Sequence, residues 1–263
     1  EYLGIASSIN ELQEKRESEQ RALRELEIAA GIQMSLMPRE FRLSEKLDAF
    51  GLCQPAHSAG GDYFDFISLD DGSVFVICAD VMGKGLSAAL FANMLRTNIL
   101  AFSGKALDPG MLLTEVNARM FPDLSRLDIF ITAFCVWISR DAGTIHHSGA
   151  GHPAGILRQK MGAISTLQSR GLPLGVLKDA IYETRKMDFE RDSSLVLFSD
   201  GISETRDQSG NFFGDEGILA VVESNPDLSA EFLVKGIVVA VDQFSGNAPL
   251  VDDRSILAVL RKA

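Results

Sequence analysis

Acidic side chains recur in this chain where apolar, strand-like runs end. They stand in the segments GGDYFDF, VICADVMGKG, LVLFSDGISE and VDDRSILAVL, and they are Asp62, Asp80, Asp200, Asp252 and Asp253. A carboxylate at the end of a buried strand is costly to desolvate, so it needs a cation or a strong hydrogen-bond donor nearby. Four such places in one chain predict a site where carboxylates share metal ions.

The first two of these acids can be placed against each other by the turn between them. Residues 63–69 and 73–79 are strand-like and are joined by Asp70-Asp71-Gly72, a strong hairpin signal. With the turn centred on Asp71, Asp62 lies opposite Asp80, and facing Cα atoms on antiparallel strands are roughly 4.5–5.5 Å apart. Two carboxylates that close repel each other unless a positive charge lies between them.

The remaining acids also lie at strand ends. The apolar run 194–198 stops at Ser199-Asp200-Gly201, and Asp252-Asp253 precedes the apolar run 256–260. Neighbouring antiparallel strands would bring these two ends together. Ligands that offer only oxygen favour hard cations such as Mg²⁺ or Mn²⁺. The four histidines and three cysteines show no zinc-binding spacing.

An ordered series of motifs carries a resemblance to a known family. The motifs are GGDYFD at 60–65, DVMGKG at 80–85 with SAAL at 87–90, GAGHP at 149–153, GLPLG at 171–175, FSDG at 198–201 with Glu204, and DDRS at 252–255. The chain resembles the PPM (PP2C-type) serine/threonine phosphatases, specifically the bacterial stage II sporulation protein E and RsbU-like branch. This resemblance implies an α+β fold, a PP2C-like antiparallel β-sandwich flanked by helices, over residues 38–263.

The resemblance also implies a ligand set and a reaction. Carried onto this chain, the metal ligands are Asp62, Asp80, the Val81 carbonyl, Asp200 and Asp252, with Asp253 as the alternative to Asp252. Asp62, Asp80 and Asp200 are the expected catalytic residues. The implied cofactors are two Mn²⁺ or Mg²⁺ ions, which activate a water molecule for direct attack on the phosphoester without a phosphoenzyme.

Four residues in or near these motifs need separate interpretation. One of them departs from the family pattern. Met82 stands where eukaryotic relatives have a histidine, so the acid that protonates the leaving group stays unassigned. Lys84 could steer phosphate or be an ordinary exposed lysine. Glu204 could orient water or be a solvated acid, and His152 is expected to be structural.

The family further implies a phosphorylated protein as substrate, typically a phosphoserine on a STAS-domain anti-sigma-factor antagonist. Residues 101–129 and 205–247 are expected to supply helices and loops for docking it. The alternative is a catalytically silent PPM-fold interaction module in a signalling protein, and only Met82 favours that alternative. The complete set of metal carboxylates favours the enzyme.

Residues 1–37 form a different kind of segment, polar and helix-favouring, with no proline before Pro38. A 4,3 spacing selects a mostly apolar seam: Ile5, Ile9, Leu12, Arg16, Glu19, Leu23, Leu26, Ala30, Gln33 and Met37. This pattern predicts a coiled-coil linker helix and a homodimer. The alternative is a solvated helix whose last turns alone pack on the phosphatase domain.

The chain starts inside this helical pattern without a Met, which predicts an upstream sensory or receiver domain in a longer protein. We hypothesise that the junction at 31–38 contacts residues near 83–90 and adjusts the metal site. This control requires an element with two states that both sites bias.

Composition excludes other classes. The net charge of −11 argues against nucleic acid. Three scattered cysteines and the lack of a long apolar span predict a cytoplasmic protein, or the cytoplasmic part of a larger sensor. The segment GKGLSA at 83–88 matches a dinucleotide-binding fingerprint, but successive hairpins around it indicate antiparallel pairing and argue against that fold.

Overall fold

The computed structural model describes residues 2–38, 40–41, 45–105, 108–224, 229–246 and 248–262 of the chain. Its helices are α1 (Tyr2–Leu36), α2 (Leu86–Ser103), α3 (Pro109–Arg126), α4 (Asp200–Ser203), α5 (Gly214–Ser224) and α6 (Ala230–Ser245). Its strands are β1 (Glu40–Phe41), β2 (Leu47–Gln54), β3 (Tyr63–Ser68), β4 (Val74–Val81), β5 (Ile131–Ile138), β6 (Thr144–Ala150), β7 (Gly155–Arg158), β8 (Ile164–Leu167), β9 (Arg185–Asp188), β10 (Ser194–Phe198) and β11 (Arg254–Arg261).

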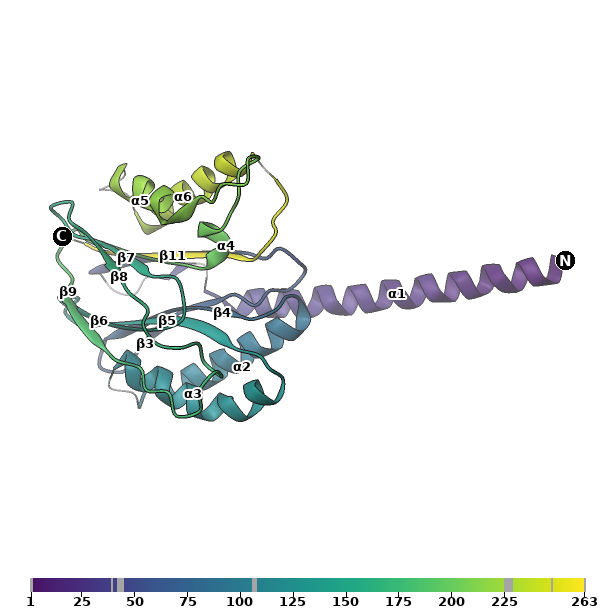
Figure 1. Cartoon of the computed structure of the whole chain (residues 1–263), viewed down its shortest axis with the longest axis horizontal. Coiled ribbons are helices and arrows are strands. Elements are labelled where there is room, and N and C mark those ends of the chain that lie inside the picture. The colour runs from purple at the N-terminus through teal and green to yellow at the C-terminus, as the bar shows by residue number, and fades with distance from the viewer. Residues whose placement is uncertain are drawn as a thin grey trace.

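The strands form two sheets that pack face to face. One has six strands in the order β1-β2-β11-β10-β7-β8, and the other has five in the order β3-β4-β5-β6-β9. Helices α5 and α6 cover the outer face of the six-stranded sheet, and α2 and α3 cover that of the five-stranded sheet (Figure 1). The predicted α+β sandwich flanked by helices is therefore confirmed.

Burial on both faces explains why the central strands are continuous apolar runs. In β4 nearly every residue is buried, because one face meets the other sheet and the opposite face meets α2. Phe64, Phe75 and Phe134 fill the larger of the two main clusters of buried apolar side chains. Burying side chains of this size contributes roughly 1.5–3 kcal/mol each, which fixes the strands that lead to the acidic ends.

The two hairpins predicted around the second motif are present. The β3–β4 pairing places Tyr63 opposite Ala79 and Phe64 opposite Cys78, which is the predicted register. The β5–β6 pairing places Ile138 opposite Ile145. The named strands pair antiparallel throughout the part of the chain that the structure describes, so the dinucleotide-binding alternative does not fit.

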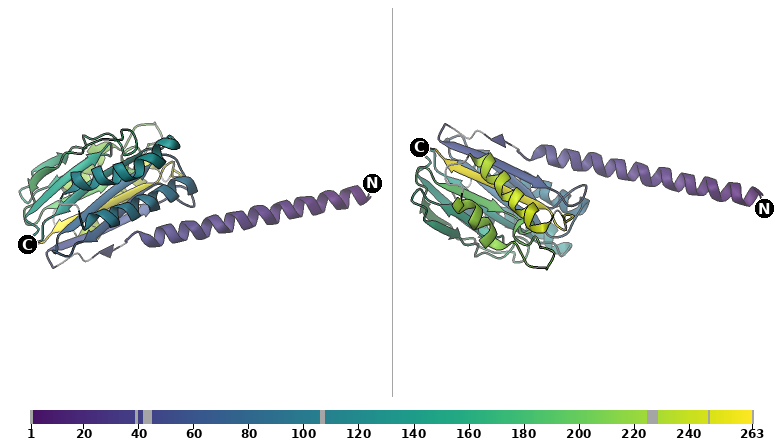
Figure 2. Two further views of the ribbon diagram at one scale, coloured as in Figure 1. Left: turned by 90° about the horizontal axis from the view of Figure 1, so that it is seen from below. Right: turned by 90° about the horizontal axis from the view of Figure 1, so that it is seen from above.

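Helix α1 projects from one end of the sandwich, and only its last turns approach the rest of the chain (Figure 2). At the C-terminal end of the expected coiled-coil seam, Ala30, Gln33 and Met37 are buried against this same chain. At this end of the helix, the seam residues therefore pack on the chain's own domain, as the alternative to a coiled coil predicts. The seam side chains at positions 5, 9, 12, 23 and 26 lie outside the described residues. The coiled coil and the homodimer stay predictions.

None of the described helices combines the length and the apolar character that crossing a bilayer requires.

Candidate metal centre

The β3–β4 hairpin positions the first two acids. The Val81 N–H donates to the Gly61 carbonyl over 3.3 Å, which continues the strand register past Asp62 and Asp80. Asp62 immediately precedes β3 and is almost completely buried, whereas Asp80 is partly exposed near the end of β4. The turn at Asp71 therefore brings these two carboxylates together, as the sequence predicts.

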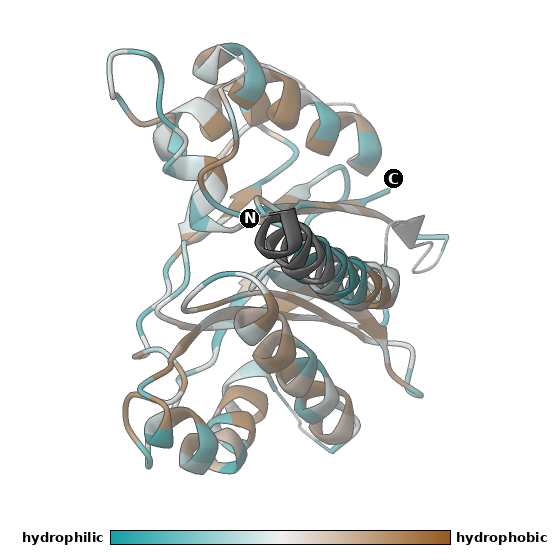
Figure 3. Ribbon diagram, turned by 90° about the vertical axis from the view of Figure 1, so that its right-hand side faces the viewer, coloured by the Kyte–Doolittle hydropathy of each residue, from teal (hydrophilic) through white to brown (hydrophobic). Residues whose placement is uncertain are grey.

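Strands β10 and β11 bring the other acids to the same end of the sandwich. Phe198 pairs with Ile256, and the Ser199 N–H donates to the Ser255 carbonyl over 2.9 Å. Asp200 follows this pair and opens α4, while the acidic pair at 252–253 precedes β11. Figure 3 views the molecule from this end, with α1 pointing toward the viewer.

Ser199 connects the two sheets at the centre. Its hydroxyl donates to Asp62 Oδ2 over 2.7 Å and accepts the Ser255 N–H over 2.9 Å. Ser199 is fully buried, so this contact fixes the orientation of the Asp62 carboxylate without competition from water. The sequence analysis missed this residue, and its position directly before Asp200 in the FSDG motif was the available signal.

The consecutive acids Asp252 and Asp253 have different surroundings. Asp253 is buried, and its two carboxylate oxygens accept the N–H groups of Ala56 and Gly61, each over 2.8 Å. Asp252 is exposed, and its Oδ2 accepts a hydrogen bond from Lys84 Nζ over 2.9 Å. Asp253 therefore holds the loop before β3, whereas Asp252 has an exposed ion pair and accepts the neighbouring Asp253 N–H at Oδ1 over 3.0 Å.

Glycines let these loops approach one another. A Cβ on Gly60 would lie 2.3 Å from Asp253 Oδ2, and a Cβ on Gly61 would lie 2.6 Å from the Val81 carbonyl oxygen. Both distances are shorter than van der Waals contact, so a larger residue at either position would push the acidic loop away from the strand end.

The carboxylates destabilise one another's charged forms. Burial and then the charge of Asp80 raise the pKa of Asp62 well above its ordinary value. Burial, followed by the charges of Asp200, Asp252 and Asp253, raises the pKa of Asp80 to about 7. Burial and the charge of Asp252 also raise the pKa of Asp200. A cation at this end of the sandwich would offset that repulsion.

The donor set fits hard divalent cations in its chemistry. It consists of carboxylates and one strand-end carbonyl, which are the ligands that Mg²⁺ and Mn²⁺ favour. Within the described residues, no three Asp, Glu, His or Cys side chains already close around one point that could hold a metal. Binding a metal ion would therefore require some of these carboxylates to move closer together.

The other residues singled out from the sequence have clear positions. His152 is buried, its Nδ1 lies 2.8 Å from Thr132 Oγ1, and burial lowers its pKa to about 3, so it fits the expected structural role. Met82 is half-exposed, and its N–H donates to the Phe130 carbonyl. Glu204 ends α4 at the rim of a cavity beside the centre.

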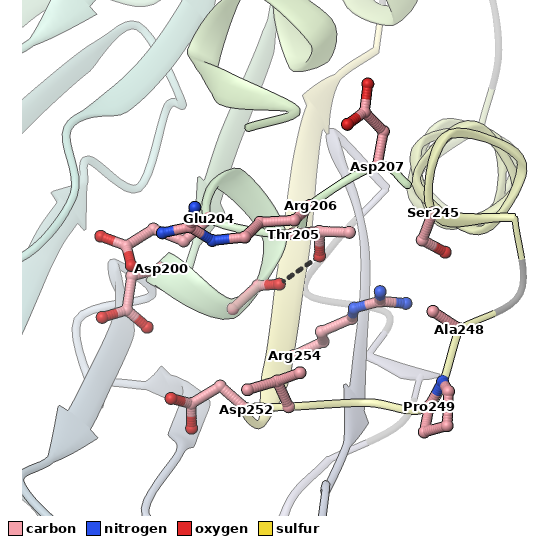
Figure 4. Close-up of a pocket in the computed structure, with 12 residues that line it drawn as sticks. Asp200, Glu204, Thr205, Arg206, Asp207, Ser245, Ala248, Pro249, Asp252 and Arg254 are labelled. Atoms are coloured by element: carbon pink, nitrogen blue, oxygen red, sulfur yellow. Dashed lines mark hydrogen bonds between the residues drawn. The ribbon is translucent and has the colours of Figure 1, made fainter. Parts of the chain in front are cut away.

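That cavity has a volume of about 410 Å³ and opens next to two of the acids. Asp200 and Asp252 lie at one end of it, and Arg254 points into it from β11 (Figure 4). The Arg254 guanidinium is paired with Asp242 over 2.8 Å, so its charge is already partly neutralised. The cavity lies between α4 and the segment that follows α6.

Helix α1 reaches the centre through Gln33. Its Nε2 donates to the Gly60 carbonyl over 2.6 Å, and its Oε1 accepts the Gly60 N–H over 3.3 Å. Ala30 forms a small buried cluster with Ala59 and Ala89, so α1 contacts both the loop before Asp62 and the start of α2. Ala30, one residue before the junction at 31–38, lies beside Ala89 in this cluster, whereas the junction residue Gln33 contacts Gly60, so the hypothesised contact between 31–38 and 83–90 stays a prediction.

Comparison with known proteins now decides the family. A sequence model of stage II sporulation protein E (SpoIIE) matches residues 70–262. The chain belongs to the SpoIIE family. It is 30% identical to phosphoserine phosphatase RsbU of Bacillus subtilis strain 168 over 99% of this chain and 77% of that protein. Membership makes the chain a phosphatase domain of the PP2C type.

Solved structures agree with the fold. The SiaA-PP2C domain of Pseudomonas aeruginosa superimposes with a TM-score of 0.81 at 20% identity, covering 94% of this chain and 99% of that domain. RsbX, solved in complex with magnesium, superimposes with a TM-score of 0.64 at 15% identity, covering 83% of this chain and 97% of that chain. These matches confirm the PP2C-like sandwich of this SpoIIE-family domain.

The Gln33 contact predicts a specific loss of stability. Gln33→Ala leaves both backbone groups of Gly60 without partners in a buried position, which should lower the free energy of unfolding by about 1–3 kcal/mol. Urea denaturation followed by circular dichroism measures this change. Gln20→Ala, at an exposed position of the same helix, is the matched control and should change little. Equal effects of the two substitutions would show that the Gly60 contact contributes nothing.

Proposed function

We propose that this SpoIIE-family domain is a metal-dependent protein serine/threonine phosphatase that uses two Mn²⁺ or Mg²⁺ ions. One observation carries the proposal: acids from four separate segments meet at one end of the sandwich, where burial and then their mutual charges raise the pKa values of Asp62, Asp80 and Asp200. The proposed ligands are Asp62, Asp80, the Val81 carbonyl, Asp200 and Asp252. The magnesium bound to RsbX, a structural neighbour, supports the choice of cation.

The chemistry divides between the cations and the chain. When bound, such cations activate water for direct attack on a phosphoester and neutralise charge on the phosphoryl oxygens. Asp62, oriented by Ser199, and Asp80, fixed by the hairpin register, provide the preorganised part of the site. Asp200 and Asp252 lie at the open edge, where they can adjust to ligands and substrate.

Asp253 takes a different role in this proposal. Sequence analysis left it as an alternative to Asp252 for the last ligand position. Because both of its oxygens already accept buried backbone N–H groups, we assign it to holding the loop at 56–61 in place. Asp252, whose one ion pair is exposed and exchangeable, is the better candidate for the ligand.

The proposed substrate is a phosphoserine or phosphothreonine on a signalling protein, and a STAS-domain anti-sigma-factor antagonist fits best. The similarity to RsbU, which is named a phosphoserine phosphatase, supports the phosphoserine. A cytoplasmic location is part of the same proposal, and the free thiols of Cys53, Cys78 and Cys135 support it. The silent interaction module remains the competing function, with Met82 as the one departure that favours it.

Substitution of Asp200 tests the enzyme against the silent module. Asp200→Asn should keep the fold but reduce Mn²⁺-dependent hydrolysis of an aryl phosphate and a phosphoserine protein, because a proposed ligand is lost. The decrease should exceed the roughly 10–100-fold effect of losing an outer partner of a metal site. Chelation should abolish the activity of the unmodified chain. An unmodified chain without activity in excess Mn²⁺ would favour the silent module.

Assigning Asp252 as the ligand and Asp253 as the residue that holds the loop predicts different effects of their substitution on Mn²⁺ binding and on stability. Asp252→Asn should weaken Mn²⁺ binding measured by calorimetry and leave the free energy of unfolding nearly unchanged, since only an exposed ion pair is lost. Asp253→Asn should lower the free energy of unfolding by about 1–3 kcal/mol, because buried N–H groups lose an acceptor. The reverse pattern would make Asp253 the ligand.

Control through α1 is also part of the proposal, together with a homodimer and an upstream sensory or receiver domain. The Gln33–Gly60 contact and the Ala30 cluster give the helix a direct connection to the loop before Asp62. Deleting residues 1–30 removes Ala30 and most of the helix, so turnover or oligomeric state should change. Phosphatase assays and analytical ultracentrifugation measure the two properties. If neither changed, the helix would have no regulatory role.

A further inference from the structure

The loop at 171–178 lies beside the metal centre, although no chemistry was assigned to it. In the five-stranded sheet Ile131 pairs with Val81 on one side and forms a bridge to Leu174 on the other. Both backbone hydrogen bonds of that bridge are present, at 3.0 and 2.8 Å. Two strand spacings of about 4.8 Å place Leu174 roughly 10 Å from the Val81 backbone. The loop therefore extends the sheet next to the proposed ligands.

A buried side chain fixes this loop. Asn117 of α3 is fully buried, and its Oδ1 accepts the Gly175 N–H over 2.9 Å. Its Nδ2 donates to the carbonyls of Leu177 and Lys178 over 2.9 and 3.0 Å. Gly175 has a φ of +91°, and a Cβ there would lie 2.8 Å from Leu124 Cβ. These hydrogen bonds and the buried Leu174 hold the loop in place, while Leu172, Val176 and Leu177 are left unburied.

Those side chains face solvent. Leu172, Val176 and Leu177 are 52%, 51% and 52% exposed, and the adjacent Phe130 and Met82 are 38% and 47% exposed. The Met82 N–H donates to the Phe130 carbonyl over 3.0 Å, and Phe130 precedes the Ile131 bridge, so the backbones of the three segments are adjacent. We call these five residues the apolar rim. Single exposed apolar residues are ordinary, whereas several on adjacent segments beside a candidate catalytic centre are a reason to look for an interface.

We propose that the apolar rim docks the apolar surface that flanks the phosphoserine on the protein substrate. This inference rests on the proposed function. A phosphoserine on a folded protein can reach the acids only if the surrounding protein surface covers the mouth of the centre. The rim borders that mouth, because Met82 directly follows the Val81 carbonyl. It also gives Met82 a role, since a flexible thioether adapts to a partner surface.

The inference differs from the docking surface expected from the sequence. That expectation placed docking on residues 101–129 and 205–247, and α6 belongs to the second segment. Val239 on α6 is 53% exposed, nearly the same as Val176. The two valines therefore serve as test and control. Substituting either one removes the same side chain at nearly the same exposure, but from a different surface.

The test compares Val176→Asp with Val239→Asp, using a phosphoserine STAS-domain protein and p-nitrophenyl phosphate as substrates with Mn²⁺. Val176→Asp should lower kcat/KM for the phosphoprotein at least tenfold, mainly through KM, because an interface anchor is replaced by a charge. Its kcat/KM for p-nitrophenyl phosphate should change less than twofold, since that substrate has no flanking surface. Val239→Asp should leave both values unchanged. Leu172→Ser is a second rim variant with the same expectation.

The outcomes separate this inference from the proposed function. If the unmodified chain hydrolyses both substrates and Val176→Asp matches Val239→Asp, the rim is not the docking surface and the phosphatase assignment stands. A selective loss in Val239→Asp would overturn the inference in favour of α6. If Val176→Asp instead changes a dimer into a monomer in analytical ultracentrifugation, the rim is a contact between two copies. If the unmodified chain hydrolyses neither substrate, the proposed function and this inference both fail.

Discussion

Repulsion among carboxylates at one end of the sandwich is the constraint on which the rest of the structure depends. Asp62 is nearly inaccessible to water, and burial together with the charges of neighbouring acids raises the pKa of Asp80 to about 7. A fold can keep acids in such an arrangement only if other interactions hold the strand ends together. The two sheets supply these interactions through their buried apolar side chains, and Ser199 joins the sheets where the acids meet.

Hydrogen bonds to backbone groups hold the loops around the centre, and glycines without a Cβ allow these loops to lie close together. Asp253 binds two N–H groups of the loop before β3, and Gln33 binds both backbone groups of Gly60 in the same loop. Gly201 has a similar role on the other side, because a Cβ there would lie 1.9 Å from the Asp253 carbonyl oxygen. Substitution of these glycines would therefore displace the acids at this end of the sandwich.

Local sequence was sufficient for part of this arrangement. The β3–β4 register followed from Asp70-Asp71-Gly72 alone, because a short turn determines which residues face each other. The meeting of Asp200 with the acidic pair followed from one apolar run that is followed by an acid and another that is preceded by two. Neither the Gln33–Gly60 contact nor the role of Asp253 could be predicted, since they join residues 27 and up to 197 positions apart. The seam of α1 was ambiguous for a related reason. The same apolar spacing suits a second helix or the chain's own domain, and Ala30, Gln33 and Met37 use the domain.

The acidic pair shows how one sequence motif meets two opposing requirements. In the proposed site, the ligand Asp252 must be free to exchange partners, whereas the loop that carries it must not move. Asp253 meets the second requirement with two buried hydrogen bonds, and Asp252 meets the first with one exposed ion pair to Lys84. Lys84 lies between Gly83 and Gly85, which both have positive φ. Its ammonium also donates to the Val251 carbonyl over 2.6 Å, so Lys84 would keep one hydrogen-bond partner if a cation competed with it for Asp252.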